Sequence, residues 1–589
     1  MPYAGEQITY GSDLMVELIR KLDIPFVAMN PGASFRGLHE SLVNFGPGQP
    51  PHVIECTHEE ISVAVAHGYA KAAGKPMMAA LHNVVGLQHA GMAIFNAWCD
   101  RVPIMMVGGG GPMDVAKRRP WIEWIHTALV QGNIVRDIVK WDDQPYSLHS
   151  LADSFYRAYR LAVTEPAGPV YVCLDAALQE DPIGDVDVSE LLPDPLYFSS
   201  GSSPAPDPQA LRKIAGAIQN ADWPVIIADH VGRSEAGFHA LAELADRWAI
   251  AVIDRYGRLN LPTDHPMNLS GDNSAVLAKA DVILSLDVRD LFGTLSAIDR
   301  VNRTTSPLIS NAVRVFAIGV QDYGVRSLTT DFQRLYPTEG SILADTKLAL
   351  PMLNEILSAS SDPAQNAKIS ARKQEIPDWH HRLREQWSQK ANESRSKTPI
   401  ATAALAAELW ELLNGRKFVL ANGDLEGWTH KIFTMDQPRQ YLGPSGGAGL
   451  GYGIGATIGA CLAHEDDHTL VVNIQSDGDF MFTPGGLWTL AHHKLPALNV
   501  MFNNRSYYNS QEHQMNTARR RGRDVIRATL GTTLDQPAID FAKMADSMGV
   551  VGIGPIYQTS EIAPALQSAL RVIEEQHRPV LVDVVTENR

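Results

Sequence analysis

Short apolar runs alternate with helix-like segments along the whole chain, and no other feature limits the fold as strongly. A short apolar run followed by an amphipathic helix is the pattern of a βαβ unit, so the alternation predicts an α/β fold with parallel sheets. A helix of small residues is expected at about Glu59–Ala73. The expected strands are Pro25–Met29, Met77–Leu81, Pro103–Val107, Pro169–Leu174, Pro224–Ala228, Ala249–Ile253, Asp281–Leu286, Pro307–Ile309, Phe418–Ala421, Thr469–Ile474, Ala497–Phe502 and Pro579–Val584.

Two polar segments divide the chain into three parts. The stretch 181–208 is rich in proline, serine and aspartate, and 362–398 is polar and charged, with a helix expected inside it. We therefore expect three Rossmann-like parallel-sheet domains, at 1–185, 205–350 and 396–589. The first and last parts are similar in size and style, which suits two related domains that face one ligand.

The charge balance argues against several kinds of partner. The chain has 589 residues, with 50 Lys and Arg against 66 Asp and Glu, and a formal net charge of −16. Such an acidic chain is a poor candidate for binding nucleic acid or an anionic membrane. Its four cysteines form no CxxC pair, and we find neither a signal-peptide core nor an apolar run that could span a membrane. We expect a soluble cytoplasmic protein.

Polar residues follow two neighbouring expected strands of the last part. Ser476-Asp477-Gly478-Asp479 follows the first strand, and Asn503-Asn504 follows the second. The carboxyl ends of parallel strands meet at one edge of a sheet, where α/β folds bind ligands. Thr483 and Pro484 predict a helix start, whose free N–H groups suit a phosphate. Oxygen ligands beside such groups favour a magnesium–diphosphate site, and two ordinary strand-end turns are the alternative.

Three further motifs accompany this pair. A glycine-rich run, GGAGLGY, begins at Gly446, and a loop-like NGDLE begins at Asn422. In the first part, Thr57-His58-Glu59-Glu60 opens the helix of small residues. Thr57 and Glu60 form a capping-box pattern, which explains Glu60 structurally. Glu59 is left over, and an acidic residue favoured by the dipole at the start of a helix is the structural alternative to a functional role.

Together these motifs resemble those of the thiamine diphosphate (ThDP) enzyme family. SDGD followed by NN resembles the family's GDG…NN motif, with Ser476 at the first glycine, and HEE…AHGYA resembles HEQ…A-x-G-Y-A. The resemblance implies thiamine diphosphate and Mg2+ as cofactors, and the domain order pyrimidine-binding, central, diphosphate-binding. It implies Asp477, Asn504 and the Ser506 carbonyl as metal ligands, and Glu59 as the catalytic acid that bonds the aminopyrimidine. The cofactor-binding residues that it implies are Gly423, Leu425, Ala448, Leu450, Gly478, Asp479 and Ser506.

The segment Leu81-His82-Asn83, with FNAW at 95–98, is similar to benzoylformate decarboxylases. That similarity implies a proton-transfer role for His82, and His126 stands where some decarboxylases of the family place an active-site residue. Residues expected to line the substrate pocket are Ala33, Ser34, Tyr508 and Gln511.

The implied activity is that of a ThDP- and Mg-dependent 2-oxo acid decarboxylase or carboligase, acting through an enamine intermediate, as in benzoylformate decarboxylase or acetolactate synthase. A lyase acting on a 2-hydroxy ketone or a 2-hydroxyacyl substrate is the alternative within the same chemistry. An inactive ThDP-binding scaffold subunit is the alternative from another class, and it rests on Ser476 and Asp424. The resemblance also implies a homodimer or homotetramer with the active site between chains.

Overall fold

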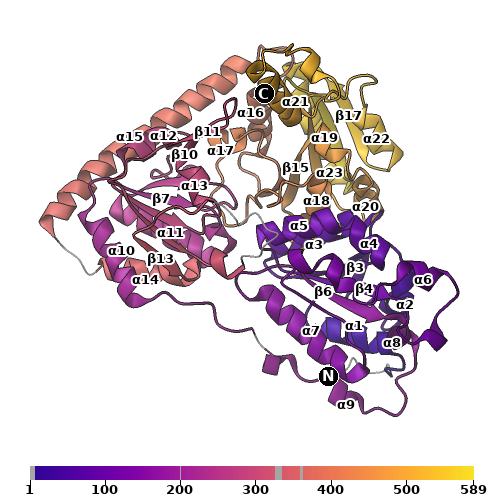
Figure 1. Ribbon diagram of the computed structural model, residues 1–589. Helices are drawn as coiled ribbons and strands as arrows, with labels where there is room; N and C mark the ends of the chain where they lie inside the picture. The colour runs from indigo at the N-terminus through magenta and orange to yellow at the C-terminus, as the bar shows by residue number, and fades with distance from the viewer. Residues whose placement is uncertain (1–6, 199, 325–333, 359–361, 589) are drawn as a thin grey trace.

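The computed structural model describes residues 7–198, 200–324, 334–358 and 362–588 of the chain. Three parallel sheets, each covered by helices, occupy three lobes that follow one another in sequence (Figure 1). The strands of these sheets span 26–175, 224–343 and 418–585. The fold class is therefore α/β, as the sequence predicts.

The first sheet has six parallel strands in the order β2-β1-β3-β4-β6-β5. Its central strands are fully buried apolar runs, as expected for a sheet covered on both faces. The strands are β1 (Phe26–Met29), β2 (His52–Glu55), β3 (Met77–Leu81), β4 (Ile104–Gly110), β5 (Trp141–Asp143) and β6 (Val170–Asp175). The helices of this part include α1 (Gly11–Lys21), α2 (Arg36–Asn44), α3 (Glu59–Ala73), α4 (Val84–His89), α5 (Gly91–Asp100), α6 (Ile122–His126) and α7 (Leu148–Val163).

The central sheet has five parallel strands in the order β13-β12-β9-β7-β8. They are β7 (Pro224–Ala228), β8 (Ala251–Asp254), β9 (Val282–Leu286), β12 (Arg314–Gly319) and β13 (Gly340–Leu343), with α10 (Pro208–Asn220), α11 (Glu235–Trp248) and α14 (Thr346–Ser358) around them. The strand expected at Pro307–Ile309 is not part of this sheet. Its first residue instead ends β11 (Thr304–Pro307), which pairs with β10 (Ser296–Asp299) in an antiparallel hairpin.

The third sheet has five parallel strands in the order β14-β15-β16-β18-β17. They are β14 (Phe418–Asn422), β15 (Leu470–Ser476), β16 (Leu498–Asn503), β17 (Val551–Ile556) and β18 (Val580–Val585). Helices of this part include α16 (Thr402–Leu413), α17 (Trp428–Ile432), α18 (Tyr452–Ala463), α21 (Tyr508–Arg520), α22 (Phe541–Ser547) and α23 (Thr559–Gln576).

The polar segment after the central sheet is mostly one helix. Helix α15 spans Pro363–Ser394 and runs along the outer edge of the central lobe toward the last one (Figure 1). Asp362 caps its start, and Arg372 on its buried side donates to the carbonyls of Trp248 and Ala249. In the described part of the chain, no helix combines the length and apolar character needed to cross a bilayer.

Helices α3 and α18 pack closely and join the first lobe to the last (Figure 1). Small residues allow this approach. A Cβ added at Gly68 would lie 2.3 Å from the Ala456 carbonyl oxygen, and one at Gly459 would lie 2.1 Å from the Val65 carbonyl oxygen. Because α3 begins with Glu59, the packing sets the position of Glu59 relative to the last lobe.

Candidate functional site

The carboxyl ends of neighbouring strands bring three predicted metal ligands together. Asp477 follows β15, and Asn504 follows β16. The backbone N–H of Ser506 donates to both side chains, at 3.1 Å to Asp477 Oδ2 and 3.0 Å to Asn504 Oδ1. These residues therefore share one edge of the third sheet, as expected for strand-end loops of a parallel sheet.

The Asp477 carboxylate is buried without a full set of partners. The residue is 1% exposed, and its Oδ1 has no hydrogen-bond partner among the described residues. Burial raises the pKa of Asp477 to about 6, against the opposing effect of backbone N–H groups such as that of Gly478. Since a buried charge needs an opposite charge nearby, this oxygen suits a bound cation.

Glycine is required at position 478 for a steric reason. A Cβ added at Gly478 would lie 2.7 Å from the ring of Tyr507. The aromatic ring therefore packs directly against the backbone beside Asp477.

The helix that the sequence predicts at Thr483 begins elsewhere. Residues Asp477–Phe480 form the short helix α19, and α20 (Gly486–His492) has Gly485 as its N-cap. The prediction that Thr483 caps a helix is wrong, because its hydroxyl donates to the Gly451 carbonyl at 2.7 Å. Thr483 thereby fastens the glycine-rich loop to the segment after Asp477.

The glycine-rich loop 446–451 is held from two lobes. Asn96 on α5 forms a reciprocal pair with Gly449, accepting its N–H at 3.0 Å and donating to its carbonyl at 3.2 Å. Asp479 accepts the N–H of Gly451 at 2.8 Å. The backbone of the loop is therefore fixed at Gly449 and Gly451, in the second half of its glycine-rich part.

The other predicted cofactor residues lie on this loop and on the loop after β14. Ala448 has a left-handed φ of 54°, and Leu450 is 38% exposed. A Cβ added at Gly423 would lie 2.1 Å from the Ile474 carbonyl oxygen, so only glycine fits there. The Leu425 side chain is fully buried in the core, so only its backbone can meet a ligand.

Glu59 is the first residue of α3, and it is 4% exposed. Its Oε2 forms no hydrogen bond within the described part of the chain, and His89 Nδ1 lies 3.4 Å away. A Cβ added at Gly86 would lie 2.7 Å from both Glu59 Oε1 and His82 Cβ. Glu59 and His82 are therefore close neighbours beside Gly86.

His58 caps α3, which corrects the capping box predicted for Thr57 and Glu60. The His58 Nδ1 accepts the N–H of Glu60 at 3.2 Å. His58, Glu59 and His89 each offer a possible ligand atom within 4.8 Å of the others. However, the Nδ1 lone pair of His58 already accepts the Glu60 N–H, so a neutral His58 carries its hydrogen on Nε2. Neither nitrogen then has a free lone pair, whereas a metal-bound histidine ligates with one nitrogen and donates a hydrogen from the other. This group is therefore unsuited to a metal ion as it stands.

His82 follows β3 and contacts two predicted site residues. Its Nδ1 lies 2.9 Å from the Ser34 hydroxyl, and its ring meets that of His126 edge-on at 5.7 Å between centroids. Burial and His126 lower the pKa of His82, while Glu59 opposes the shift. Ser34 is 5% exposed, so its hydroxyl is directed to His82 within the protein.

The remaining predicted pocket residues have different surroundings. Ala33 is exposed at the start of a 3-10 turn after β1, and Tyr508 is half-buried at the start of α21. Gln511 is 9% exposed, and its Oε1 accepts the Ser506 hydroxyl at 2.5 Å. Gln511 therefore braces the loop that carries Ser506.

Glu60, next to Glu59 at the start of α3, lies close to the glycine-rich loop of the same chain. A Cβ added at Gly451 would lie 2.9 Å from Glu60 Oε1. Burial and the nearby Asp479 raise the pKa of Glu60 to about 7. The start of α3 therefore lies directly beside the loops of the last lobe.

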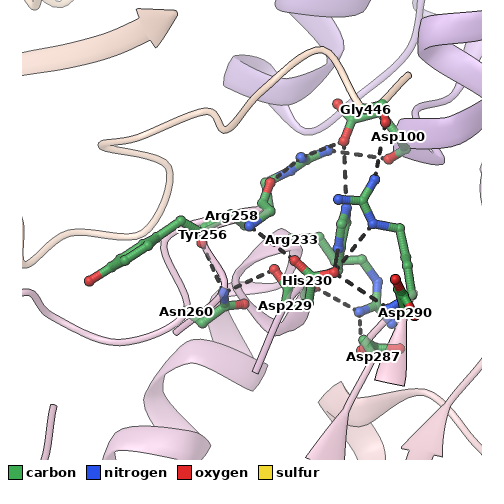
Figure 2. Close-up of polar contacts among 12 residues, drawn as sticks. Asp100, Asp229, His230, Arg233, Tyr256, Arg258, Asn260, Asp287, Asp290 and Gly446 are labelled. Carbon is green, nitrogen blue, oxygen red and sulfur yellow. Dashed lines mark hydrogen bonds and ion pairs between the residues drawn. The ribbon is translucent and has the colours of Figure 1, made fainter. Parts of the chain in front are cut away.

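A buried ion cluster joins all three lobes behind this site. Asp100 at the end of α5 contacts Arg258 of the central lobe at 2.7 Å (Figure 2). It also contacts Lys71 at 2.8 Å and His67 at 2.8 Å. Lys71 also donates to the carbonyl of Pro444, just before the glycine-rich loop, at 2.7 Å. Burial alone would raise the pKa of Asp100, but Arg258 and Lys71 hold it well below its usual range.

Replacing Asp100 by Asn should destabilise the protein by about 3 kcal/mol, because two buried cations would lose their counter-charge. The Asp100, Lys71 and Arg258 side chains are at most 9% exposed, so water cannot substitute. Scanning calorimetry of the variant would show a lower midpoint temperature for the first unfolding transition. Asp153→Asn, which makes the same change at an exposed position of the same lobe, is the control. Equal midpoint temperatures in the two variants would contradict the role of Asp100 as the counter-charge of Lys71 and Arg258.

No motif of the sequence marks Asp100 as a site-supporting residue, and FNAW at 95–98 marks Asn96 only as part of a resemblance. Each acts on a segment that is distant in the chain: Arg258 lies 158 positions from Asp100, and Gly449 lies 353 positions from Asn96. His89 was likewise not predicted, and its approach to Glu59 depends on how α4 lies across α3.

Both outer parts of the chain match domains of known enzymes. Residues 9–132 match the N-terminal TPP binding domain of thiamine pyrophosphate enzymes, and residues 421–584 match the C-terminal TPP binding domain.

Similar proteins extend over nearly the whole chain. Acetolactate synthase 3 of Brassica napus, a chloroplastic protein, is 24% identical over 602 residues, covering 99% of this chain and 84% of its own. The probable acetolactate synthase 2 of Oryza sativa subsp. japonica is 25% identical, covering 84% and 71%. Benzoylformate decarboxylase from Polynucleobacter necessarius has the same fold, with a TM-score of 0.76, 20% identity and 98% and 99% coverage. With both cofactor-binding domains present in the expected order, the chain belongs to the thiamine pyrophosphate enzyme family.

Proposed function

We propose that the protein is a ThDP- and Mg2+-dependent enzyme that decarboxylates a 2-oxo acid and releases an aldehyde or joins the product to a second carbonyl compound. One observation carries this proposal. Two buried carboxylates, Glu59 and Asp477, each keep an oxygen without a hydrogen-bond partner in the described part of the chain. Burying such an oxygen costs free energy of folding unless a bound ligand satisfies it.

The residues present fit the diphosphate end of the cofactor and its metal ion. Asp477, Asn504 and the Ser506 carbonyl would hold Mg2+, whose preferred ligands are oxygens. The backbone of Gly423 and Leu425 and the segment at Gly478 would face the diphosphate. Burial raises the pKa of Asp477, which means that its ionised form lacks compensation, and a bound cation would provide it.

The other end of the cofactor would lie between Glu59 and the glycine-rich loop. Glu59 Oε2 would exchange a proton with the aminopyrimidine ring. The Leu450 side chain would pack against the cofactor, and the Ala448 carbonyl would accept a hydrogen bond from the amino group of its aminopyrimidine ring. Asn96 and Asp479 would keep that loop in place through Gly449 and Gly451.

Bound thiamine diphosphate supplies a nucleophilic carbon for the substrate carbonyl and a sink for the electrons left by departing carbon dioxide. The chain's own residues do the remaining work. His82, beside Glu59 and in contact with His126, would hold or deliver a proton at the substrate. Buried walls around Glu59 would limit the access of water to the reacting carbon.

The similar proteins support only part of the proposed reaction class. Acetolactate synthases and benzoylformate decarboxylases both appear among the similar proteins, which supports 2-oxo acid chemistry without choosing between release and ligation. The exposed Ala33 at the start of its turn adds no polar contact for a substrate carboxylate, and this favours keeping ligation and lyase activity within the proposal.

Carbon dioxide release tests the proposal directly. Purified protein with ThDP and Mg2+ would be assayed against a panel of aliphatic and aromatic 2-oxo acids, with aldehyde and 2-hydroxy ketone products separated by chromatography. We expect release with at least one acid, and the product identifies decarboxylase or carboligase. Cleavage of 2-hydroxy ketones or 2-hydroxyacyl compounds with no release would favour the lyase. ThDP binding without any turnover would favour the scaffold subunit.

A further inference from the structure

Ser34 is held rigidly in the 3-10 turn Ala33–Phe35 that follows β1. Its carbonyl accepts from Gln179 Nε2 at 3.1 Å. Gly109 on β4 lies against it so closely that a Cβ there would come within 2.0 Å of the Ser34 carbonyl oxygen. Because the backbone cannot move far, the Ser34 hydroxyl has a defined position between its two hydrogen-bond partners, His82 and the backbone of Asn83.

Those two partners fix the direction of the hydrogen bonds. The Asn83 backbone N–H lies 3.1 Å from Ser34 Oγ and can only donate, so Oγ accepts there. The hydroxyl hydrogen is then free to be donated, and His82 Nδ1 lies 2.9 Å away. Among the described residues, no other acceptor is found for this hydroxyl. A neutral His82 therefore accepts at Nδ1 and carries its own hydrogen on Nε2.

We propose that Ser34 is a positioning residue that holds neutral His82 in the Nε2–H tautomer, so that His82 presents a hydrogen-bond donor to the carbonyl oxygen of a 2-oxo acid. The proposal rests on the function proposed above, in which His82 faces the substrate. It gives Ser34 a role in the orientation of His82, in place of the direct substrate contact that the sequence suggests.

The surroundings of His82 agree with a neutral ring. Ser34, Asn83, His126 and Glu59 are the polar groups near it, and burial together with His126 lowers its pKa while Glu59 opposes. If His82 were protonated, its Nδ1–H would require Ser34 Oγ to accept twice, and the hydroxyl hydrogen would lose its acceptor. The hydrogen-bond chain thus favours the neutral ring with a defined tautomer, as an orienting group does in other catalytic histidines.

The tautomer can be measured without any turnover. Nitrogen-15 NMR of histidine-labelled protein, with the His82→Gln variant identifying the signals of His82, should show an unprotonated Nδ1 and a protonated Nε2 at neutral pH. In Ser34→Ala this pattern should change to a mixture of tautomers. A protonated Nδ1 in the unaltered protein, or an unchanged pattern in Ser34→Ala, would overturn the proposal.

Kinetics provide the second readout. Ser34→Ala should lower kcat by about 10²-fold, the lower end of the loss expected for an acid–base group, with KM within about twofold. A rise in KM with kcat unchanged would instead make Ser34 a substrate contact. Ser154→Ala is the matched control, because Ser154 lies on α7 of the same lobe and is also buried, at 2% exposed. Its hydroxyl donates to Asp143 on β5 at 2.9 Å. The NMR result stands even if no 2-oxo acid is turned over, so failure of this inference is distinguishable from failure of the proposed function.

Discussion

Replacing Glu59 by Gln should lower turnover of the best 2-oxo acid by about 10³-fold, within the range for loss of an acid–base group. The amide keeps the shape of the side chain but cannot exchange a proton at the position of Oε2, which the described structure leaves without a hydrogen bond. The initial rate of carbon dioxide release at saturating ThDP measures the effect. Because the substituted group is 4% exposed and isosteric, the fold should remain intact.

Glu17→Gln is the matched control for this variant. Glu17 is also buried in the first lobe, where it pairs with Arg20 at 3.5 Å, on a helix that carries no site residue. Its turnover should stay within about twofold of the unaltered protein. Turnover by Glu59→Gln at the unaltered rate would remove Glu59 from the mechanism.

Replacing Asp477 by Asn should weaken Mg2+-dependent ThDP binding by at least about 10²-fold, since loss of groups that merely support metal ligands already costs 10–100-fold. Titration calorimetry of the cofactor-free protein with ThDP and Mg2+ measures this. The same substitution should leave the cofactor-free protein at least as stable as before. Asp477 is buried with its pKa raised to about 6, so a neutral side chain removes an uncompensated charge.

Asp466→Asn is the control, because it makes the same change at an exposed position of the last lobe. It should leave both the cofactor affinity and the stability as they were. Unaltered Mg2+-dependent affinity in Asp477→Asn would contradict the assignment of this residue as a metal ligand.

Mixing the Glu59→Gln and Asp477→Asn variants tests the expectation, implied by the family resemblance, that each active site forms between chains. The structure brings the start of α3 beside Asp479 and Gly451 of the same chain. If Glu59 of one chain serves Asp477 of another, a mixed dimer of Glu59→Gln and Asp477→Asn chains contains one intact site, and activity returns after the subunits are mixed. If both residues come from one chain, every site in the mixture carries a substitution and activity stays absent.

Most of the buried inner strands could be located from the sequence to within a few residues. Strands β3 and β7 have the predicted bounds, because an uninterrupted apolar run between polar or turn-forming residues indicates a strand buried on both faces. Four of the strands that were missed, β2, β5, β13 and β17, lie at sheet edges, although the edge strands β8 and β14 were predicted. The inner strand β12 (Arg314–Gly319) was also missed, since the sequence predicts a strand at Pro307–Ile309 in its place. The sequence of β17, VGIGPI, contains glycine and proline, which are tolerated at an edge and argue against a central strand.

The candidate site was predictable to the extent that strand ends determine it. Asp477 and Asn504 lie together because adjacent parallel strands end at one edge of the sheet. Side-chain partners were not predictable. The Ser34–His82 contact depends on how a turn after β1 lies against the end of β3, and the placement of Thr483 depends on a loop 32 positions earlier. The sequence pattern reports local structure, whereas these contacts arise from the way separate elements pack.

The buried cluster at Asp100 has a consequence for how sequences of this kind can change. One carboxylate serves both Lys71 and Arg258, and the side chains of both cations are at most 9% exposed. A descendant that loses the carboxylate alone keeps two buried positive charges, and one that loses a cation alone leaves the carboxylate undercompensated. Substitutions at positions 71, 100 and 258 should therefore be inherited together, so that residues from two different lobes evolve as a single unit.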